Sequence, residues 1–152
     1  MKKLTAFILA SILILSLTAC GLLKDEGTYK IGNDTVTSIA GVLGELGARK
    51  VNSIETGIDD GIQTNTYGYK TDPEDPTQAA EDLAVYFKYL QNNEGFVSMK
   101  AFSGLPYEGG VEIQLAKNSV DEGKIIILDI EYDATGYTLT FTKGKGTLEI
   151  NE

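Results

Sequence analysis

The side chains that most often carry chemistry in proteins are nearly missing from this chain. It has no histidine and a single cysteine, Cys20, among 152 residues. Without histidine, the commonest general base, the usual zinc ligand and every triad built on imidazole are excluded. With one cysteine, no disulfide can form within the chain. The composition therefore predicts a protein that is not an enzyme and that holds no cofactor and no metal.

Carboxylates are the remaining candidates for chemistry, and the chain has 22 of them. Two facing acids could make a small hydrolase, but no pair stands out among so many. Asp129, Glu131 and Asp133 alternate like the start of a calcium loop, yet Ala134 and Thr140 stand where such a loop needs glycine and glutamate. Alternating acids are typical of the solvated face of a strand. We prefer that interpretation, with weak calcium binding as the open alternative.

Gly144-Lys145-Gly146-Thr147 superficially resembles a phosphate-binding loop. Such a loop needs an earlier glycine and a following helix whose N-terminus meets the phosphate, and the sequence indicates neither. We therefore expect residues 143–149 to form a charged edge of the last strand, where lysines discourage pairing with other strands.

The lone cysteine closes an N-terminal segment with the layout of a secretory signal peptide. Lys2 and Lys3 precede an apolar run, Leu4 to Ser16, which is too short to span a bilayer comfortably. The stretch that follows, Leu17-Thr18-Ala19-Cys20-Gly21, resembles the lipobox of bacterial lipoprotein precursors.

This resemblance covers residues 1–21 only. It implies cleavage between Ala19 and Cys20, a diacylglycerol group on the Cys20 thiol, and a protein held by that lipid on the extracytoplasmic face of the cell membrane. A thiol that carries lipid is neither a nucleophile nor a metal ligand. The alternatives are a plain signal peptide, or an N-terminal membrane helix with an incidental cysteine.

Removal of residues 1–19 takes away two lysines and no acid, so the net charge changes from −9 to −11. A chain this acidic is a poor match for nucleic acid or for anionic lipid headgroups, which both require lysine and arginine. It suits a solvated surface or a cationic partner.

Residues 20–33 are expected to be the lipidated cysteine and a short tether, with a brief strand at Thr28 to Ile31. Residues 34–152 are expected to form a single α+β domain. Asp34 or Thr35 would cap a first helix over 36–46, whose apolar residues recur at helical spacing. These apolar residues are Val36, Ile39, Ala40, Leu43 and Leu46.

A hairpin and a second helix follow in the pattern. Asp59-Asp60-Gly61 suits the tight turn of a hairpin over residues 50–71, with bulges suggested at Gly57 and Gly68. Asp75 and Gln78 then indicate the start of a helix over 76–93, with Gly95 after its end. The expected apolar stripe of this helix contains Ala79, Ala80, Leu83, Ala84, Phe87 and Leu90, and Asp82 is expected to face solvent.

Four strands complete the pattern: Phe96 to Phe102, Val111 to Lys117, Lys124 to Tyr132 and Tyr137 to Lys143. A loop over 133–136 places Tyr132 opposite Tyr137, and the same register pairs Ile130 with Leu139 and Leu128 with Phe141. The opposite, wet face then pairs Glu131 with Thr138 and Asp129 with Thr140. The predicted fold is an antiparallel sheet of about six strands with two helices on one face, in the order α-β-β-α-β-β-β-β.

The sequence favours a binding module over an enzyme. The module would engage an unknown protein or envelope component through one sheet face or through the loop at 103–110, and it would bind no nucleic acid. Two alternatives stay open: a small envelope hydrolase with paired carboxylates, and an inhibitory or structural lipoprotein. The candidate partner-binding residues are Leu105, Pro106 and Tyr107 on the loop, and Tyr67 and Tyr69 on the second strand of the hairpin.

Overall fold

The computed structural model describes residues 27–44, 50–100 and 104–149. Residues 1–26, which include the predicted signal peptide and the lipobox, lie outside the described part of the chain. The described residues form an α+β fold with one sheet of six antiparallel strands and two helices, one of them short.

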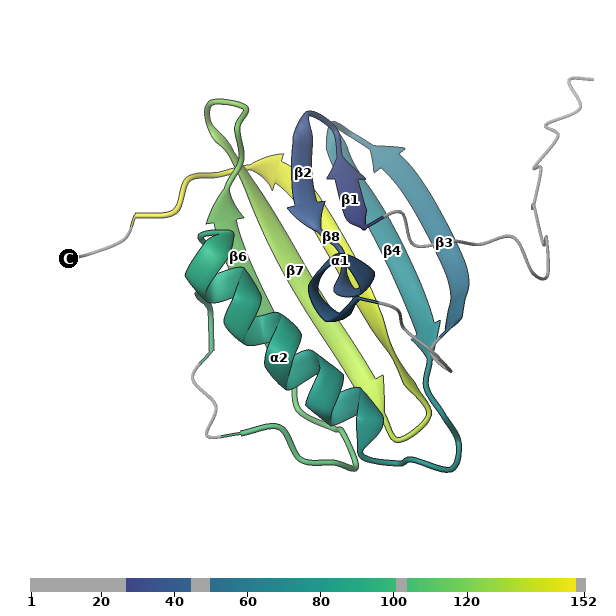
Figure 1. Cartoon of the computed structure of the whole chain (residues 1–152). Helices are drawn as coiled ribbons and strands as arrows, with labels where there is room; N and C mark the ends of the chain where they lie inside the picture. The colour runs from purple at the N-terminus through teal and green to yellow at the C-terminus, as the bar shows by residue number, and fades with distance from the viewer. Residues whose placement is uncertain (1–26, 45–49, 101–103, 150–152) are drawn as a thin grey trace, which may run out of the picture.

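The elements follow one another in nearly the predicted order, with an additional hairpin at the start (Figure 1). They are β1 (Thr28–Ile31), β2 (Asp34–Thr37), α1 (Ile39–Leu43), β3 (Lys50–Asp59), β4 (Ile62–Lys70), α2 (Gln78–Asn93), β5 (Val97–Ser98), β6 (Ile113–Asn118), β7 (Lys124–Asp133) and β8 (Gly136–Lys145). The large sheet has the order β3-β4-β8-β7-β6-β5, and β1 pairs with β2 in a separate sheet of two strands.

Both helices and the β1–β2 hairpin lie on the same face of the large sheet (Figure 1). The helix α2 runs over β6 and β7, whereas the hairpin covers β4 and β8, with α1 between them. We call this covered side of the sheet the inner face, and the opposite side the outer face.

The clearest sequence predictions are confirmed. Tyr132 pairs with Tyr137, and the ladder continues with each of the pairs expected for both faces of β7 and β8. Between β3 and β4 the chain turns at Asp60 and Gly61, whose φ angles of 46° and 77° are the left-handed values that a two-residue turn requires. After α2, Gly95 has a φ angle of 74° and the Phe96 amide donates to the Leu90 carbonyl oxygen, which ends the helix.

The first helix is present within the predicted range 36–46, but its predicted start and caps are wrong. Residues 34–37 are a strand, and α1 begins only after Ser38, whose hydroxyl accepts a hydrogen bond from the Gly41 amide. The strand at 28–31 is present, but it belongs to the folded domain and not to a tether, because Tyr29 and Ile31 are buried in the core. The ordered fold therefore starts before Asp34.

Smaller differences concern α2 and β5. Helix α2 begins at Gln78 and not at Pro76, and Asp82, expected in solvent, is buried and accepts a hydrogen bond from the Tyr137 hydroxyl at 3.4 Å. Ala84, expected in the core, is exposed. The strand expected from Phe96 is only Val97–Ser98 among the described residues. The hairpin bulge lies between Val51 and Ser53, where Gly68 was suggested, whereas the register is continuous at Gly57.

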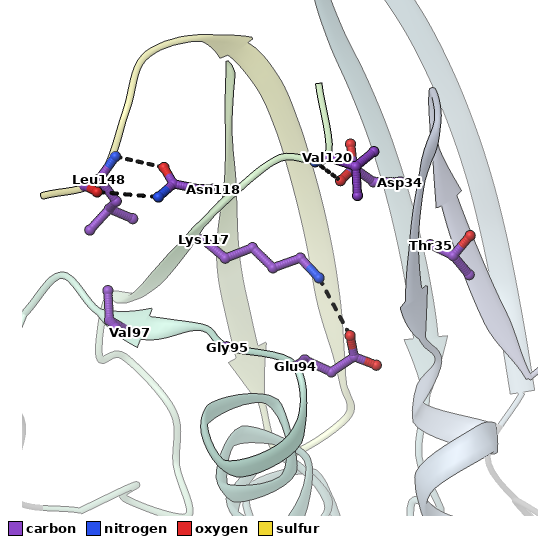
Figure 2. A pocket seen from close by; sticks show the side chains of 9 residues that line it. All are labelled: Asp34, Thr35, Glu94, Gly95, Val97, Lys117, Asn118, Val120 and Leu148. Atoms are coloured by element: carbon purple, nitrogen blue, oxygen red, sulfur yellow. Dashed lines mark hydrogen bonds and ion pairs between the residues drawn. The ribbon is translucent and has the colours of Figure 1, made fainter. Parts of the chain in front are cut away.

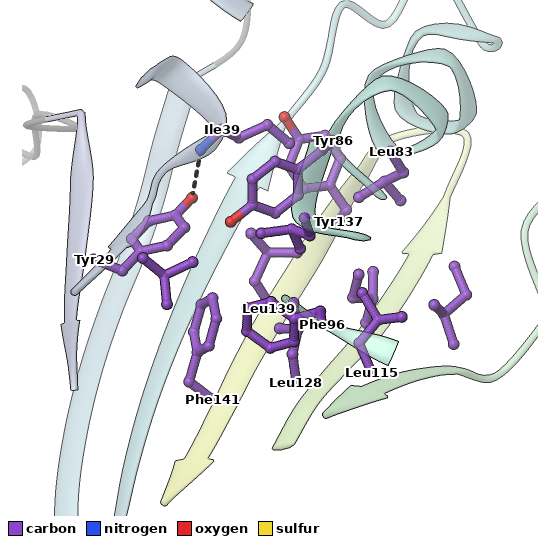
Figure 3. Packing of buried hydrophobic residues seen from close by; sticks show 14 of the residues in the cluster. Tyr29, Ile39, Leu83, Tyr86, Phe96, Leu115, Leu128, Tyr137, Leu139 and Phe141 are labelled. Carbon is purple, nitrogen blue, oxygen red and sulfur yellow. Dashed lines mark hydrogen bonds between the residues drawn. The ribbon is translucent and has the colours of Figure 1, made fainter. Parts of the chain in front are cut away.

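The core lies between the sheet and its two covers (Figure 3). Leucines and isoleucines fill the half under α2, while five aromatic rings gather between the hairpin and the sheet. Tyr29 and Tyr67 have ring centroids 4.2 Å apart, and Tyr69 stacks on Tyr137 at 5.1 Å. The Tyr29 hydroxyl lies 2.6 Å from the Tyr69 hydroxyl and also accepts a hydrogen bond from the Ile39 amide, so the hairpin and α1 are joined to β4.

Candidate functional site

A buried lysine between two aspartates is the strongest concentration of charge in the described chain. Lys143 comes from β8, Asp34 from the start of β2 and Asp121 from the loop between β6 and β7. The Lys143 ammonium lies 2.5 Å from Asp34 Oδ2 and 2.8 Å from Asp121 Oδ2. Lys143 is only 3% exposed and Asp34 only 2%. We call these three residues the charge cluster.

Further hydrogen bonds connect the charge cluster to the backbone around it. Asp34 accepts from the Ser119 hydroxyl at 2.6 Å and from the Val120 amide at 2.8 Å. The Asn33 side chain donates to Asp121 at 3.0 Å. The cluster thereby fastens the β1–β2 turn and the β6–β7 loop to the end of β8.

The surroundings of the cluster keep all three groups charged. Burial opposes ionisation of Asp34, but hydrogen bonds from Lys143, Ser119 and Val120 hold its pKa below the ordinary value. The hydrogen bond from Lys143 and that from Asn33 lower the pKa of Asp121 to about 2. For Lys143, burial acts to lower the pKa, but the two aspartates outweigh it and raise the pKa.

Two hollows flank the charge cluster. The first, of about 270 Å³, lies between β2, the end of α2 and β6 (Figure 2). The second, of about 240 Å³, lies beyond Lys143 and is bordered by Ile58, Gln63 and Lys124. Both hollows are small and open to solvent. They are lined in part by charged side chains that already form ion pairs with one another.

In the first hollow a second ion pair crosses from β6 to the end of α2 (Figure 2). The Lys117 ammonium lies 3.4 Å from Glu94 Oε2 and 5.0 Å from the centre of the Phe96 ring. Glu94 Oε1 accepts hydrogen bonds from the amide and the hydroxyl of Thr37 at 3.1 and 2.6 Å. Burial acts to raise the pKa of Glu94, but the Thr37 and Lys117 contacts lower it overall. Glu94 thereby links the end of α2 both to Thr37 of β2 and to Lys117 of β6.

The chemistry of these groups favours a structural role. A general acid needs a carboxyl group whose pKa is raised toward neutrality. Every described carboxyl group with a resolved shift has a lowered pKa, namely Asp34, Glu94, Asp121 and Asp133. Lys143 is protonated and paired, so it is neither a base nor a nucleophile. The charge cluster therefore orders the turns around it.

The two tyrosines of β4 that were candidates for partner binding lie under the β1–β2 hairpin. Tyr69 is 3% exposed and takes part in the core contacts with Tyr29 and Tyr137. Tyr67 is half-buried and packs against Tyr29 and Phe141. Tyr69 therefore has no surface to offer a partner, and Tyr67 has little.

The three loop candidates divide into a buried and an exposed part. Leu105 packs against the core, and the Pro106 carbonyl oxygen accepts a hydrogen bond from the Tyr132 hydroxyl at 2.8 Å. Tyr107 is 54% exposed. The structure does not bring this loop together with Tyr67 and Tyr69, because those side chains lie beneath the hairpin. Residues 101–103 lie outside the described chain.

The expected charged edge after Lys143 was predicted wrongly. The strand β8 lies between β4 and β7 in the middle of the sheet, so it has no free edge. The alternation of β8 could have shown the buried lysine: Tyr137, Leu139 and Phe141 point inward, and Lys143 is the next residue with the same orientation. Its partner Asp34 could not be found in this way, because it lies 109 residues away in the sequence.

The acids proposed as the start of a calcium loop are separated by the strand geometry. Asp129 accepts a hydrogen bond from the Gln114 side chain at 2.7 Å on the outer face, and Asp133 accepts from Thr135 in the β7–β8 turn. Across residues 27–44, 50–100 and 104–149, no three His, Cys, Asp or Glu side chains gather as ligands of one metal ion would.

Threonines dominate the outer face, which neither helix nor the hairpin covers. They stand side by side on two neighbouring strands, and Thr66 and Thr140 have hydroxyl oxygens 3.3 Å apart. All are half-buried among their neighbours. They are Thr64 and Thr66 on β4 and Thr138, Thr140 and Thr142 on β8. Glu131 of β7 is exposed on the same face.

None of the helices among the described residues is long and apolar enough to cross a membrane.

Comparisons with known proteins give this fold no relative. No family model matches the chain, and neither a curated protein nor a solved structure is significantly similar to it. The fold is that of an α+β domain whose six-stranded antiparallel sheet is covered on one face by two helices and a hairpin. Its function must be argued from its own surfaces.

Proposed function

We propose that this chain is a lipid-anchored, extracytoplasmic binding module with no catalytic role, and that it docks a partner protein through the outer face of its sheet. The proposal combines the lipobox at Cys20 with the arrangement of the covers. One observation carries it: both helices and the hairpin occupy the inner face, so that no described helix or hairpin covers the outer face over β4, β8 and β7.

The outer face suits recognition of a protein. It is broad and antiparallel, and short threonine side chains give it polar groups that lose little conformational entropy on contact. Glu131 and Asp129 add negative charge, in agreement with a cationic partner. Groups held on a rigid sheet bind with less ordering cost than groups on a loop.

The position of the N-terminal end supports the same orientation. The Gly27 carbonyl oxygen accepts a hydrogen bond from the Ser38 amide, so the chain enters the fold beside α1, on the inner side. Six residues lie between Cys20 and Gly27, and an extended chain across these seven Cα-to-Cα steps spans at most about 25 Å. An anchor at Cys20 would hold the inner side toward the bilayer and present the outer face away from it.

The anchor is tested by mass. Protein from its host should carry a diacylglycerol increment on Cys20, and Cys20→Ala should leave the membrane fraction. An unmodified Cys20, or a Cys20→Ala variant that stays membrane-bound, would contradict the anchored part of the proposal.

The docking face is tested by photo-crosslinking in intact cells. A photoreactive residue at Thr140 on the outer face should give discrete adducts with another protein. The matched control is the same residue at Lys88, which is exposed on α2. Adducts from position 88 alone, or from neither position, would contradict docking through the outer face.

A further inference from the structure

The outer edge of β3 is an exposed strand edge of unusual composition. Within the described residues β3 pairs with β4 and with no other strand. Because Asp59 and Ile62 flank a two-residue turn, they form a hydrogen-bonded pair, and alternate residues of β3 then bond to β4. The amide and carbonyl groups of Ile54, Thr56 and Ile58 therefore point outward along the free edge.

The regular part of this edge lacks three of the usual protections against pairing. Soluble proteins often place lysine, proline or inward-pointing charge on such edges. The regular part of β3, Ser53–Asp59, has neither lysine nor proline, and its inner-face side chains are Ile54, Thr56 and Ile58. Ile58 is 79% exposed and Ile54 is 40% exposed. Two isoleucines on one side of a free edge form a ready surface for another strand.

The regular segment is complementary to itself. The bulge after Val51 and the turn at Asp60 bracket seven residues centred on Thr56. In an antiparallel pair centred there, Ile54 lies opposite Ile58 of the second copy, and Glu55 lies opposite a glycine, Gly57. A pair centred one residue earlier would instead oppose two Glu55 side chains, which is unfavourable.

We propose that two copies of this chain associate through β3, centred on Thr56, and form one continuous sheet of twelve strands. The three outward-facing residues of each copy would supply about six backbone hydrogen bonds between copies. The two-fold axis stands normal to the sheet, so both inner faces and both Gly27 ends lie on the same side. Two copies anchored as proposed above could thus pair within one membrane.

The proposed interface is small, so the extent of dimer formation depends on the local concentration of the two copies. A single strand pairing buries less surface than the roughly 1,200 Å² of a stable complex. Anchoring to a membrane raises the effective concentration of the two copies, which compensates for a weak contact. Pairing is therefore expected in the membrane and at high protein concentration.

Cysteine crosslinking of the full chain in host membranes tests the pairing. Residues in a hydrogen-bonded antiparallel pair have Cα atoms about 5.5 Å apart, within the range of a disulfide. Under mild oxidation Thr56→Cys should give a disulfide-linked dimer, whereas Glu131→Cys, exposed on the outer face, should not. Equal crosslinking of the two variants, or none at Thr56→Cys, would overturn the proposal.

The register has its own test. Differently tagged Ile54→Cys and Ile58→Cys copies should crosslink with each other more than each does with itself. A second change, Ile58→Lys, places a charge in the pair and should lower the Thr56→Cys dimer about tenfold. Val85→Lys replaces a similarly exposed apolar residue on α2, 51% exposed, and should leave the dimer unchanged. Crosslinks that are insensitive to Ile58→Lys would contradict the register.

The Cys20→Ala background separates this proposal from the anchored function. Purified at high concentration, Cys20→Ala/Thr56→Cys should still form the dimer although it is not lipidated. A dimer together with an unmodified wild-type Cys20 would refute the anchor alone. Lipidation without a dimer in either setting would refute the pairing alone.

Discussion

Two covers lie side by side on the inner face of one sheet, and they are held by different forces. Under α2 the core is mainly aliphatic: Leu83 and Leu90 belong to one cluster with Leu115 and Leu128, and all four are fully buried. Under the β1–β2 hairpin, the buried side chains of Tyr29, Ile31 and Val36 are joined by polar contacts, with the Tyr29–Tyr69 hydroxyl pair at one end and the Asp34–Lys143 ion pair at the other.

The difference follows from the size of the two covers. A helix of 16 residues presents a continuous apolar stripe, which hydrophobic burial holds without directional bonds. A hairpin with two strands of four residues buries only three hydrophobic side chains, Tyr29, Ile31 and Val36, and hydrogen bonds and ion pairs add to their contribution. Directional contacts also fix the position of the hairpin. Variants in each half should therefore respond differently to cavity formation and to pH.

The largest loss of stability is expected from Leu128→Ala, beneath α2. Leu128 is fully buried, so the substitution leaves a cavity and should lower the free energy of unfolding by about 4 kcal/mol. Urea unfolding followed by circular dichroism measures the change. The loss should be the same at pH 5 and pH 8, because no charge is altered. A loss below about 1 kcal/mol would show that this half is loosely packed.

Asp34→Asn, beneath the hairpin, should cost about 3 kcal/mol, because Lys143 stays buried with one of its two carboxylates removed. The double variant Asp34→Asn/Lys143→Met removes both charges and should recover most of this loss. If the double variant is as unstable as the single one, the ion pair is not the contact that holds the hairpin. The same urea titration compares the three proteins.

The pH dependence of unfolding should separate the two halves further. Asp34 and Asp121 have lowered pKa values in the folded protein, so their contribution is complete above the unfolded pKa near 4. It is lost as pH falls through the folded pKa values, which for Asp121 is about 2. The raised pKa of Lys143 acts at the other extreme: its contribution is complete below the unfolded pKa near 10.4 and is lost as pH rises through the folded value.

Unfolding midpoints between pH 2 and 11 measure this dependence. Leu128→Ala should shift the whole curve without changing its shape. Asp34→Asn/Lys143→Met should flatten it at both ends, where the wild-type protein loses the cluster. Parallel curves for all three proteins would mean that the cluster contributes nothing to the pH profile.

The smallest expected effect belongs to Tyr69→Phe. It removes the hydroxyl that lies 2.6 Å from the Tyr29 hydroxyl but keeps the stack on Tyr137. The loss should be about 1 kcal/mol, the usual worth of one buried hydrogen bond. Thermal unfolding measures it, with Tyr107→Phe on the exposed loop as the control that should change nothing. A loss of stability equal to that of Asp34→Asn would show that the tyrosine hydroxyl pair holds the hairpin as strongly as the ion pair does.

The half under α2 was largely predictable, because its signals are local. The spacing of Ala79, Leu83 and Leu90 indicates a helix, and the alternation that pairs Tyr132 with Tyr137 indicates the register of β7 and β8. The prediction failed for Asp82, which is buried and not exposed on this helix. Its hydrogen-bond donor, Tyr137, lies 55 positions away in the sequence, so no local pattern indicates the contact.

The hairpin half was missed for a reason that is also local. Tyr29 and Ile31 alternate, Gly32 and Asn33 suit a turn, and Val36 continues the alternation. The same Val36 also fits a helical spacing with Ile39 and Leu43. The helical pattern extends over more residues than the alternation of a four-residue strand, so it was the stronger signal. Short elements carry too few residues to decide between the two periods.

The sequence by itself determined the class of fold, the main helix, the β7–β8 register and the β3–β4 turn, because each depends on residues close together in the chain. Only the tertiary structure decided that β8 is central, that Lys143 is buried between two aspartates and that β3 pairs with β4 alone among the described strands. These features depend on which distant segments meet, as Asp34 and Lys143 do across 109 residues, and no local pattern encodes that meeting.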